Sequence, residues 1–241
     1  AVPITFGFAL SSYVARLGNR IVCIEKSAGE LIGQFSGAVG AYNAQSILLD
    51  DPLLFEEEFL SILGLQKADH STQIVPPEYL LDLLHALIST FGVLANMSDD
   101  MRHLQRSEID EVAESFSSDQ VGSSTMPHKR NPINFENIKS LYKTFAPRIM
   151  TYYLDQISEH QRDLTNSASS RFTGEIFCAL FLAAKRLSKT MAKVVLNKES
   201  LHRNLYQNKD KILAEPYYLI LAKYGYPDAH ETVRKCVQNP E

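Results

Sequence analysis

Apolar residues recur every three or four positions along most of the chain, which is the spacing of one face of an α-helix. The first such stretch covers residues 5–32, and a loop with three glycines follows it at 33–40. A short helix is predicted at 51–63, where an Asp-Pro pair opens it and a glycine ends it. Because no alternating pattern extends beyond a few residues, we expect an all-α protein.

The longest periodic stretch follows Pro76-Pro77 and extends to about Gln105, with its apolar face broken near Ser98. Thirty helical residues correspond to about 45 Å, which is longer than an average globular helix. A helix of this length favours a bundle of long helices packed side by side.

Another long helix is predicted from Pro132. Pro147 lies inside it and should produce a kink, because the carbonyl of Lys143 loses its hydrogen-bond partner.

A further long helix follows a polar segment at 161–171, in which Thr165, Asn166 and Ser167 are suitable N-caps. After Asn197 only two shorter helical patterns remain, at about 211–224 and 228–237. We therefore expect a central helical-bundle domain at 1–197 and the start of a small C-terminal helical domain at 198–241.

The composition excludes several classes of partner. With 45% apolar and 22% charged residues and a net charge of −4, the chain has an ordinary globular composition and no basic footprint for nucleic acid. No run of apolar residues approaches the ~18 needed for a membrane span. Cys23, Cys178 and Cys236 have neither metal-site nor disulfide spacing, which indicates reduced thiols and a cytoplasmic protein. We expect no metal, cofactor, nucleic-acid or membrane partner.

The first candidate for chemistry is the segment 122–132, Gly-Ser-Ser-Thr-Met-Pro-His-Lys-Arg-Asn-Pro. Its glycine and serines leave backbone N–H groups free to face an anion. Asn131 and Pro132 are typical of an N-cap and first helical residue, so a positive helix end should follow. Lys129 adds a full charge, and such a setting could also favour deprotonation of Ser123. The alternative is a flexible loop before a capped helix.

The second candidate is the polar segment at 161–171. Arg162 and Arg171 flank the N-terminus of the next helix, and arginine binds phosphate in a bidentate manner. A capped loop with two surface arginines is the alternative. The acidic stretch before the first candidate fits a solvated face better than a metal site; its members are Glu108, Asp110, Glu111 and Glu114.

The segment 122–132 resembles the signature loop of the fumarase/aspartase superfamily of lyases. Its variant Met-Pro-His-Lys-Arg-Asn-Pro is similar to that of adenylosuccinate lyases and of carboxymuconate cycloisomerases. Four other segments resemble those of the adenylosuccinate lyases in particular; they lie at 162–167, 36–40, 72–73 and 214–216. These matches cover essentially the whole chain.

The resemblance implies a long-helix bundle that joins three more copies in a tetrameric core. It also implies a carbon–nitrogen lyase of purine biosynthesis. Its substrate would be adenylosuccinate, which loses fumarate to give AMP, or the succinylated aminoimidazole carboxamide ribonucleotide.

The resemblance further assigns roles to single residues. Ser123 would be the catalytic base that removes the proton next to the carboxylate. Lys129 and Asn131, with N–H groups of the loop around Ser124, would hold the succinyl carboxylate where negative charge develops. The nucleotide phosphate would be bound by Arg162, Ser167 and Arg171, and a polar part of the substrate by Gln73.

The chain departs from the family pattern at several points. The family's Thr-His-Gly-Gln segment, whose histidine is the expected acid, would lie just upstream of Ala1. We therefore expect a fragment, without the N-terminal domain and most of the C-terminal domain, that is inactive by itself. Gln34 stands where a lysine is common, and Gln45 where related bacterial enzymes often have histidine.

Two other functions are alternatives. A carboxymuconate-type cycloisomerase would not need Arg162 and Arg171 to bind its substrate, because a muconate carries no phosphate. A helical oligomerisation scaffold without catalysis would be expected to have a damaged signature loop, and the loop at 122–132 is intact.

Overall fold

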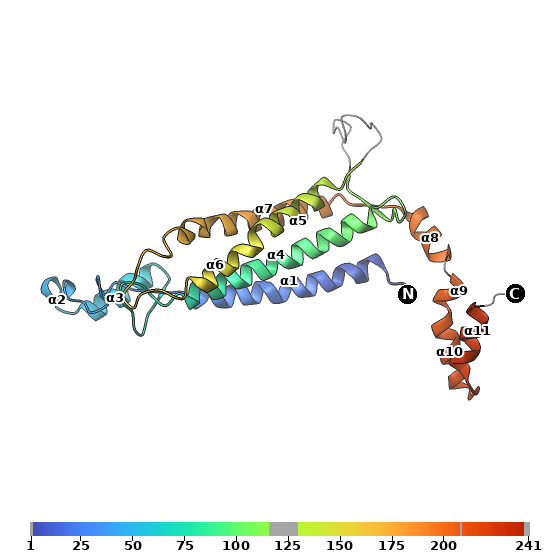
Figure 1. Cartoon of the computed structure of the whole chain (residues 1–241), viewed down its shortest axis with the longest axis horizontal. Helices are drawn as coiled ribbons and strands as arrows, with labels where there is room; N and C mark the ends of the chain where they lie inside the picture. Colours follow the sequence, from blue (N-terminus) through green and yellow to red (C-terminus); the bar gives the residue numbers. More distant parts are fainter. Residues whose placement is uncertain (1, 116–129, 208, 239–241) are drawn as a thin grey trace.

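The computed structural model describes residues 2–115, 130–207 and 209–238, and its long helices lie side by side as an elongated bundle (Figure 1). The bundle is built from α1 (Phe6–Gly29), α4 (Glu78–Leu104), α5 (Ile133–Phe145), α6 (Ile149–Leu154) and α7 (Thr173–Met191). At one end lie α2 (Gln45–Leu48) and α3 (Pro52–Ile62). Beyond the other end lie α8 (Lys198–Gln207), α9 (Lys209–Ile212), α10 (Ala214–Lys223) and α11 (Ala229–Gln238).

The expectation of an all-α fold is confirmed, and the strands in the described residues are only two residues long. β1 (Ile32–Gly33) pairs in parallel with β2 (Gln66–Lys67), which ties the loop after α1 to the segment before α4. β3 (Val112–Ala113) pairs antiparallel with β4 (Val195–Leu196) near the opposite end of the bundle.

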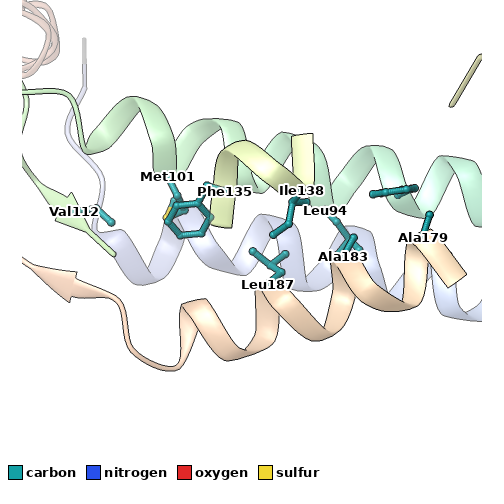
Figure 2. Packing of buried hydrophobic residues seen from close by; sticks show 9 residues of the cluster. Leu94, Met101, Val112, Phe135, Ile138, Ala179, Ala183 and Leu187 are labelled. Carbon is teal, nitrogen blue, oxygen red and sulfur yellow. The ribbon is translucent and has the colours of Figure 1, made fainter. Parts of the chain in front are cut away.

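The core forms around α4, which packs against α1, α5 and α7. Figure 2 shows side chains from α4, α5 and α7 meeting in one apolar cluster; its buried members include Leu94, Met101, Phe135, Ile138, Ala183 and Leu187. By length and composition α4 could cross a membrane, but 61% of its most apolar window is buried inside the bundle. That burial identifies it as the core helix of the bundle.

Most of the predicted helix limits are confirmed. Thr5 caps α1 by accepting a hydrogen bond from the N–H of Phe8 at 3.1 Å, and Asp51 caps α3 through the N–H groups of its first turn. A 3₁₀ turn at Ala146–Arg148 separates α5 from α6, which is the kink expected at Pro147. Ser98 does not interrupt α4, because it is buried and its hydroxyl donates to the carbonyl of Leu94.

Two expectations about polar residues are wrong. The predicted caps at 165–167 lead into a 3₁₀ turn at Ser169–Phe172, and α7 begins only at Thr173, without a side-chain cap. The acidic stretch is also not one solvated face. Asp110 accepts hydrogen bonds from Asn197 and Ser200, so it holds the start of α8, a helix that the pattern had not predicted. The division of the chain at 197/198 remains a prediction.

Candidate functional site

The structure places the described candidate residues at opposite ends of α4. Gln73 precedes the first residue of α4 by five positions, whereas Asn131 follows Arg130, whose carbonyl is bound by Gln105 just after the end of α4. At 1.5 Å per residue, the 27 residues of α4 separate these two ends by roughly 40 Å. Ser123, Ser124 and Lys129 lie outside the described residues.

At the Asn131 end, the predicted cap of α5 is wrong. Pro132 occupies the N-cap position, and the side chain of Asn131 makes no capping bond. The cap comes instead from Glu114, which is only 6% exposed. One of its carboxylate oxygens accepts the N–H groups of Asn134 and Phe135, both at 2.9 Å, and the other accepts the side-chain amide of Asn134 at 2.7 Å. A distant carboxylate therefore satisfies the helix N-terminus.

Gln105 joins the two backbone positions that flank the undescribed segment. Its side-chain oxygen accepts the N–H of Glu114 at 2.9 Å, and its side-chain nitrogen donates to the carbonyl of Arg130 at 3.4 Å. The backbones of Glu114 and Arg130 are thus both held next to the C-terminus of α4.

A cavity of about 590 Å³ opens beside Glu114 and Asn134. Its wall is strongly basic, with Lys185, Arg186, Lys189 and Lys193 among the lining residues. The surroundings of the α5 N-terminus are therefore positive, as a site for a carboxylate requires.

At the other end of α4, Gln73 lies in a network of neutral side chains. Its backbone carbonyl accepts a hydrogen bond from the side-chain amide of Gln34 at 2.9 Å. The oxygen of that amide accepts from the N–H and the hydroxyl of Ser36, at 2.7 and 2.8 Å. The Ser36 hydroxyl in turn lies 2.7 Å from that of Ser71. The side chain of Gln73 is exposed and forms no hydrogen bond within the described part of the chain.

The buried carboxylate of Glu56 holds the backbone next to this network. Glu56 on α3 is 1% exposed, and its two oxygens accept the N–H of Phe35 and the hydroxyl of Tyr42, each at 2.5 Å. Burial and the bond to Glu56 raise the pKa of Tyr42 to about 12. The backbone of the loop is thereby fixed on the side facing α3.

The arginine segment lies at the same end of α4 as Gln73. Tyr152, which belongs to the apolar cluster with Leu81 and Leu84 of α4, donates its hydroxyl to the carbonyl of Ser169. Arg171 donates to the carbonyl of Ser167 at 2.6 Å. The segment is thus anchored to the first half of α4.

Both arginines of this segment face solvent. Arg162 and Arg171 are exposed, and Arg162 has a left-handed backbone with a φ of 131°. Hydrogen bonds from Thr165 and from the N–H of Glu159 lower the pKa of Asp163 below its usual value. This end of the chain therefore presents the exposed side chains of Arg162, Arg171 and Gln73.

One chain alone does not bring the two sets of candidates together. Within the described residues there is also no cluster of three or more acidic, histidine or cysteine side chains that could hold a metal ion. Sequence reasoning missed Gln105, Glu114 and Glu56, because their partners lie 9–25 positions away and no local pattern marks them.

Comparison with known proteins gives two family matches. Residues 1–144 match the model of the family described as "Lyase", and residues 158–241 match the model described as "Adenylosuccinate lyase C-terminal". Among curated relatives, the adenylosuccinate lyase of Archaeoglobus fulgidus is 34% identical over 98% of this chain and 53% of its own length. That of Pyrococcus horikoshii is 35% identical over 98% of this chain and 52% of its own. The chain spans about half the length of these relatives.

The fold has a counterpart among solved structures. The 3-carboxy-cis,cis-muconate lactonizing enzyme of Pseudomonas putida superposes with a TM-score of 0.86 at 24% identity, over 99% of this chain and 53% of that one. At this identity the likeness concerns the fold alone. Since the lyase model matches more than half of the chain, the protein belongs to the lyase family that also includes the adenylosuccinate lyases, a branch of the fumarase/aspartase superfamily.

Proposed function

We propose that the protein is an adenylosuccinate lyase, which eliminates fumarate from adenylosuccinate to give AMP and acts in the same way on the succinylated aminoimidazole carboxamide ribonucleotide. The observation that carries this proposal is the 34–35% identity to adenylosuccinate lyases over 98% of the chain. The separate match of residues 158–241, which include both arginines, to the adenylosuccinate lyase model supports the same substrate class.

The elimination requires a base, stabilisation of the carbanion next to the carboxylate, and protonation of the leaving nitrogen. Ser123 is the base in this proposal. Lys129 and Asn131, together with the backbone around Ser124, hold the succinyl carboxylate. The basic cavity beside Glu114 supports an anionic substrate at that end of the chain.

The nucleotide part is bound at the other end of α4. Arg162, Arg171 and Ser167 hold the phosphate, and both arginine side chains are exposed. Gln73 contacts a polar part of the substrate through its open side-chain amide. The two groups of residues lie at opposite ends of a long helix, so a complete site combines the Asn131 end of one copy with the Gln73 end of another.

A homotetramer would allow this combination. Exposed apolar side chains follow α1 and α7, although both helices belong to the bundle; they are Phe8, Val14, Ile21, Val22, Phe177, Phe181 and Leu182. Apolar surface of this extent is typical of an interface. We expect light scattering on a sizing column to give the mass of four copies, and we place the enzyme in the cytoplasm.

The carboxymuconate cycloisomerases are the alternative within the same fold. Their likeness to this chain is structural only, and a muconate offers no phosphate to Arg162 and Arg171. Fumarate release from adenylosuccinate distinguishes the two functions directly.

The test uses the protein at its full natural length. Fumarate release from adenylosuccinate is followed for the wild type, for Ser123→Ala and for the control Ser12→Ala, whose hydroxyl bonds only its own helix. We expect release to fall at least ~100-fold in Ser123→Ala, as for loss of a general base, and to stay unchanged in the control. No release from folded wild type would refute the proposal.

A mixing experiment tests the composite site. Ser123→Ala and Arg171→Ala are each expected to be inactive. When their subunits are exchanged into mixed tetramers, activity should return, because some sites then combine an unmutated Ser123 from one subunit with an unmutated Arg171 from another. Absence of any recovery, with exchange verified by mass, would contradict a site shared between copies.

A further inference from the structure

Gln34 connects the loop after α1 to the backbone of Gln73. Both halves of its amide are used: the nitrogen donates to the Gln73 carbonyl at 2.9 Å, and the oxygen accepts two bonds from Ser36. Because Ser36 gives its hydroxyl hydrogen to Gln34, it can only accept from Ser71, whose hydroxyl is 2.7 Å away. A continuous chain of hydrogen bonds therefore links residues 34–36 to residues 71–73.

The two segments are also in direct backbone contact. A Cβ atom at Gly40 would lie 2.1 Å from the carbonyl oxygen of Ser71, and Gly40 has a left-handed φ of 74°. Only glycine fits this approach. Gln34 thus connects two backbone segments, 34–40 and 71–73, that are already in close contact.

The far side of the loop is held equally firmly. Glu56 accepts the N–H of Phe35, and the side-chain amide of Gln45 donates to the carbonyl of the same residue at 2.9 Å. Both backbone groups of Phe35 are therefore fixed. Gln34, which directly precedes Phe35, therefore has a fixed backbone on one side, and its side chain connects that backbone to Gln73.

We infer that Gln34 is a positioning residue, which fixes the backbone of Gln73 so that the free Gln73 side chain meets a polar group of the nucleotide substrate. This rests on the proposed function. The bond to Gln73 needs a donor at this position: a carboxylate would face the Gln73 carbonyl without a hydrogen, whereas an ammonium would keep this bond and lose only the bonds from Ser36.

The test compares Gln34→Leu with Gln66→Leu in the full-length enzyme. Gln66 is a matched control, since its side-chain amide also donates to a backbone carbonyl, that of Gly29, at 2.9 Å. We expect Gln34→Leu to raise KM for adenylosuccinate about tenfold with little change in kcat, as for loss of uniform binding. Gln66→Leu should leave both constants unchanged. An unchanged KM in Gln34→Leu would overturn the inference.

Two conservative variants separate the halves of the amide. Gln34→Lys keeps a donor for the Gln73 carbonyl and should recover most of the affinity, whereas Gln34→Glu keeps only the acceptor and should resemble Gln34→Leu. The reverse order would show that the bonds to Ser36, and not the one to Gln73, set the affinity, and would refute the assignment.

A double variant tests whether the effect passes through Gln73. Gln34→Leu should raise KM no further when Gln73→Ala is already present. An equal rise in both backgrounds would mean that Gln34 acts elsewhere.

Amide hydrogen exchange tests the inference independently of enzyme activity. The N–H groups of Thr72 and Ile74 are bonded within the segment, and they should exchange faster in Gln34→Leu than in Gln66→Leu. Equal exchange would overturn the inference. An inactive wild type with faster exchange would instead refute the proposed function alone.

Discussion

Near each end of α4 lies a buried glutamate from another segment, Glu56 of α3 and Glu114 after β3, and the two organise the neighbouring backbone in contrasting surroundings. Glu56 holds a loop, and Phe55 and Phe59 beside it in α3 pack on the ring of Phe35. Glu114 holds the first turn of a helix and faces a cavity with a basic wall. The same residue type therefore serves as a hydrogen-bond acceptor at one end, and as both acceptor and counter-charge at the other.

The largest effect is expected at the helix end. Glu114→Ala leaves the N–H groups of Asn134 and Phe135 without their acceptor, and it removes a negative charge from a helix N-terminus. We expect the free energy of unfolding to fall by about 3 kcal/mol, from the loss of charged hydrogen bonds and of the cap. Urea unfolding monitored by circular dichroism measures this.

Glu114→Gln separates the two contributions. Its remaining oxygen can still accept both backbone N–H groups, but the charge and the bond from the side-chain amide of Asn134 are lost, which should reduce stability by about 1.5 kcal/mol. Glu108→Ala is the control, because that side chain is 71% exposed and its removal should leave stability unchanged. Equal losses in the Ala and Gln variants would show that the two backbone N–H bonds contribute nothing to the cap.

The loop end should respond to alkaline pH. Burial, with the bond to Glu56, raises the pKa of Tyr42 to about 12, above its ordinary value of 10. A raised pKa of an acid means that the folded state favours the protonated hydroxyl, so this stabilisation is complete below pH 10 and is lost as pH rises toward 12. Tyr13, which is buried and donates to Asp100, has a pKa raised to about 12 in the same way.

Tyr42→Phe removes one of these two contributions. Stability at neutral pH should fall by about 1 kcal/mol, the value of one hydrogen bond, and the decline between pH 10 and 12 should become shallower than in the wild type. Tyr224→Phe is the control, because that side chain is 81% exposed. An unchanged alkaline slope in Tyr42→Phe would exclude Tyr42 as its source.

The same comparison explains what the sequence could predict. Local signals predicted the limits of α1 and α3 and the kink at Pro147, because each depends on residues within one helical turn. The cap of α5 could not be predicted in this way. Asn131 has the right residue type, but the N–H groups bond to Glu114, twenty positions before Asn134, which β3 and Gln105 bring to the helix.

The candidate site shows a similar limit. Single motifs identified Gln73, Arg171 and Asn131, because their residue types suit anions and amides. The pattern gave no sign that they lie at opposite ends of α4, since that depends on how the helices pack. From sequence, Gln34 is only a departure from a family pattern, and its bond to the Gln73 carbonyl gives that departure a physical meaning.

The smallest effect is expected for exposed charges near the Glu114 end. Lys139 on α5 lies 2.7 Å from Asp99 on α4, and the two side chains are 30% and 28% exposed. Partial burial opposes ionisation of Asp99, but hydrogen bonds from Lys139 and Arg102 outweigh it and lower the pKa of this carboxyl.

Lys139→Ala should therefore reduce the free energy of unfolding by only about 0.5 kcal/mol, the usual range for a solvent-screened pair. Because the pKa of Asp99 is lowered, this contribution is present at neutral pH and disappears as acid protonates the carboxyl; salt should weaken it as well. Unfolding in urea at neutral pH, at acidic pH and in 1 M NaCl measures all three. A loss as large as that in Glu114→Ala would mean that exposed charge, and not the buried cap, holds α5 to the end of α4.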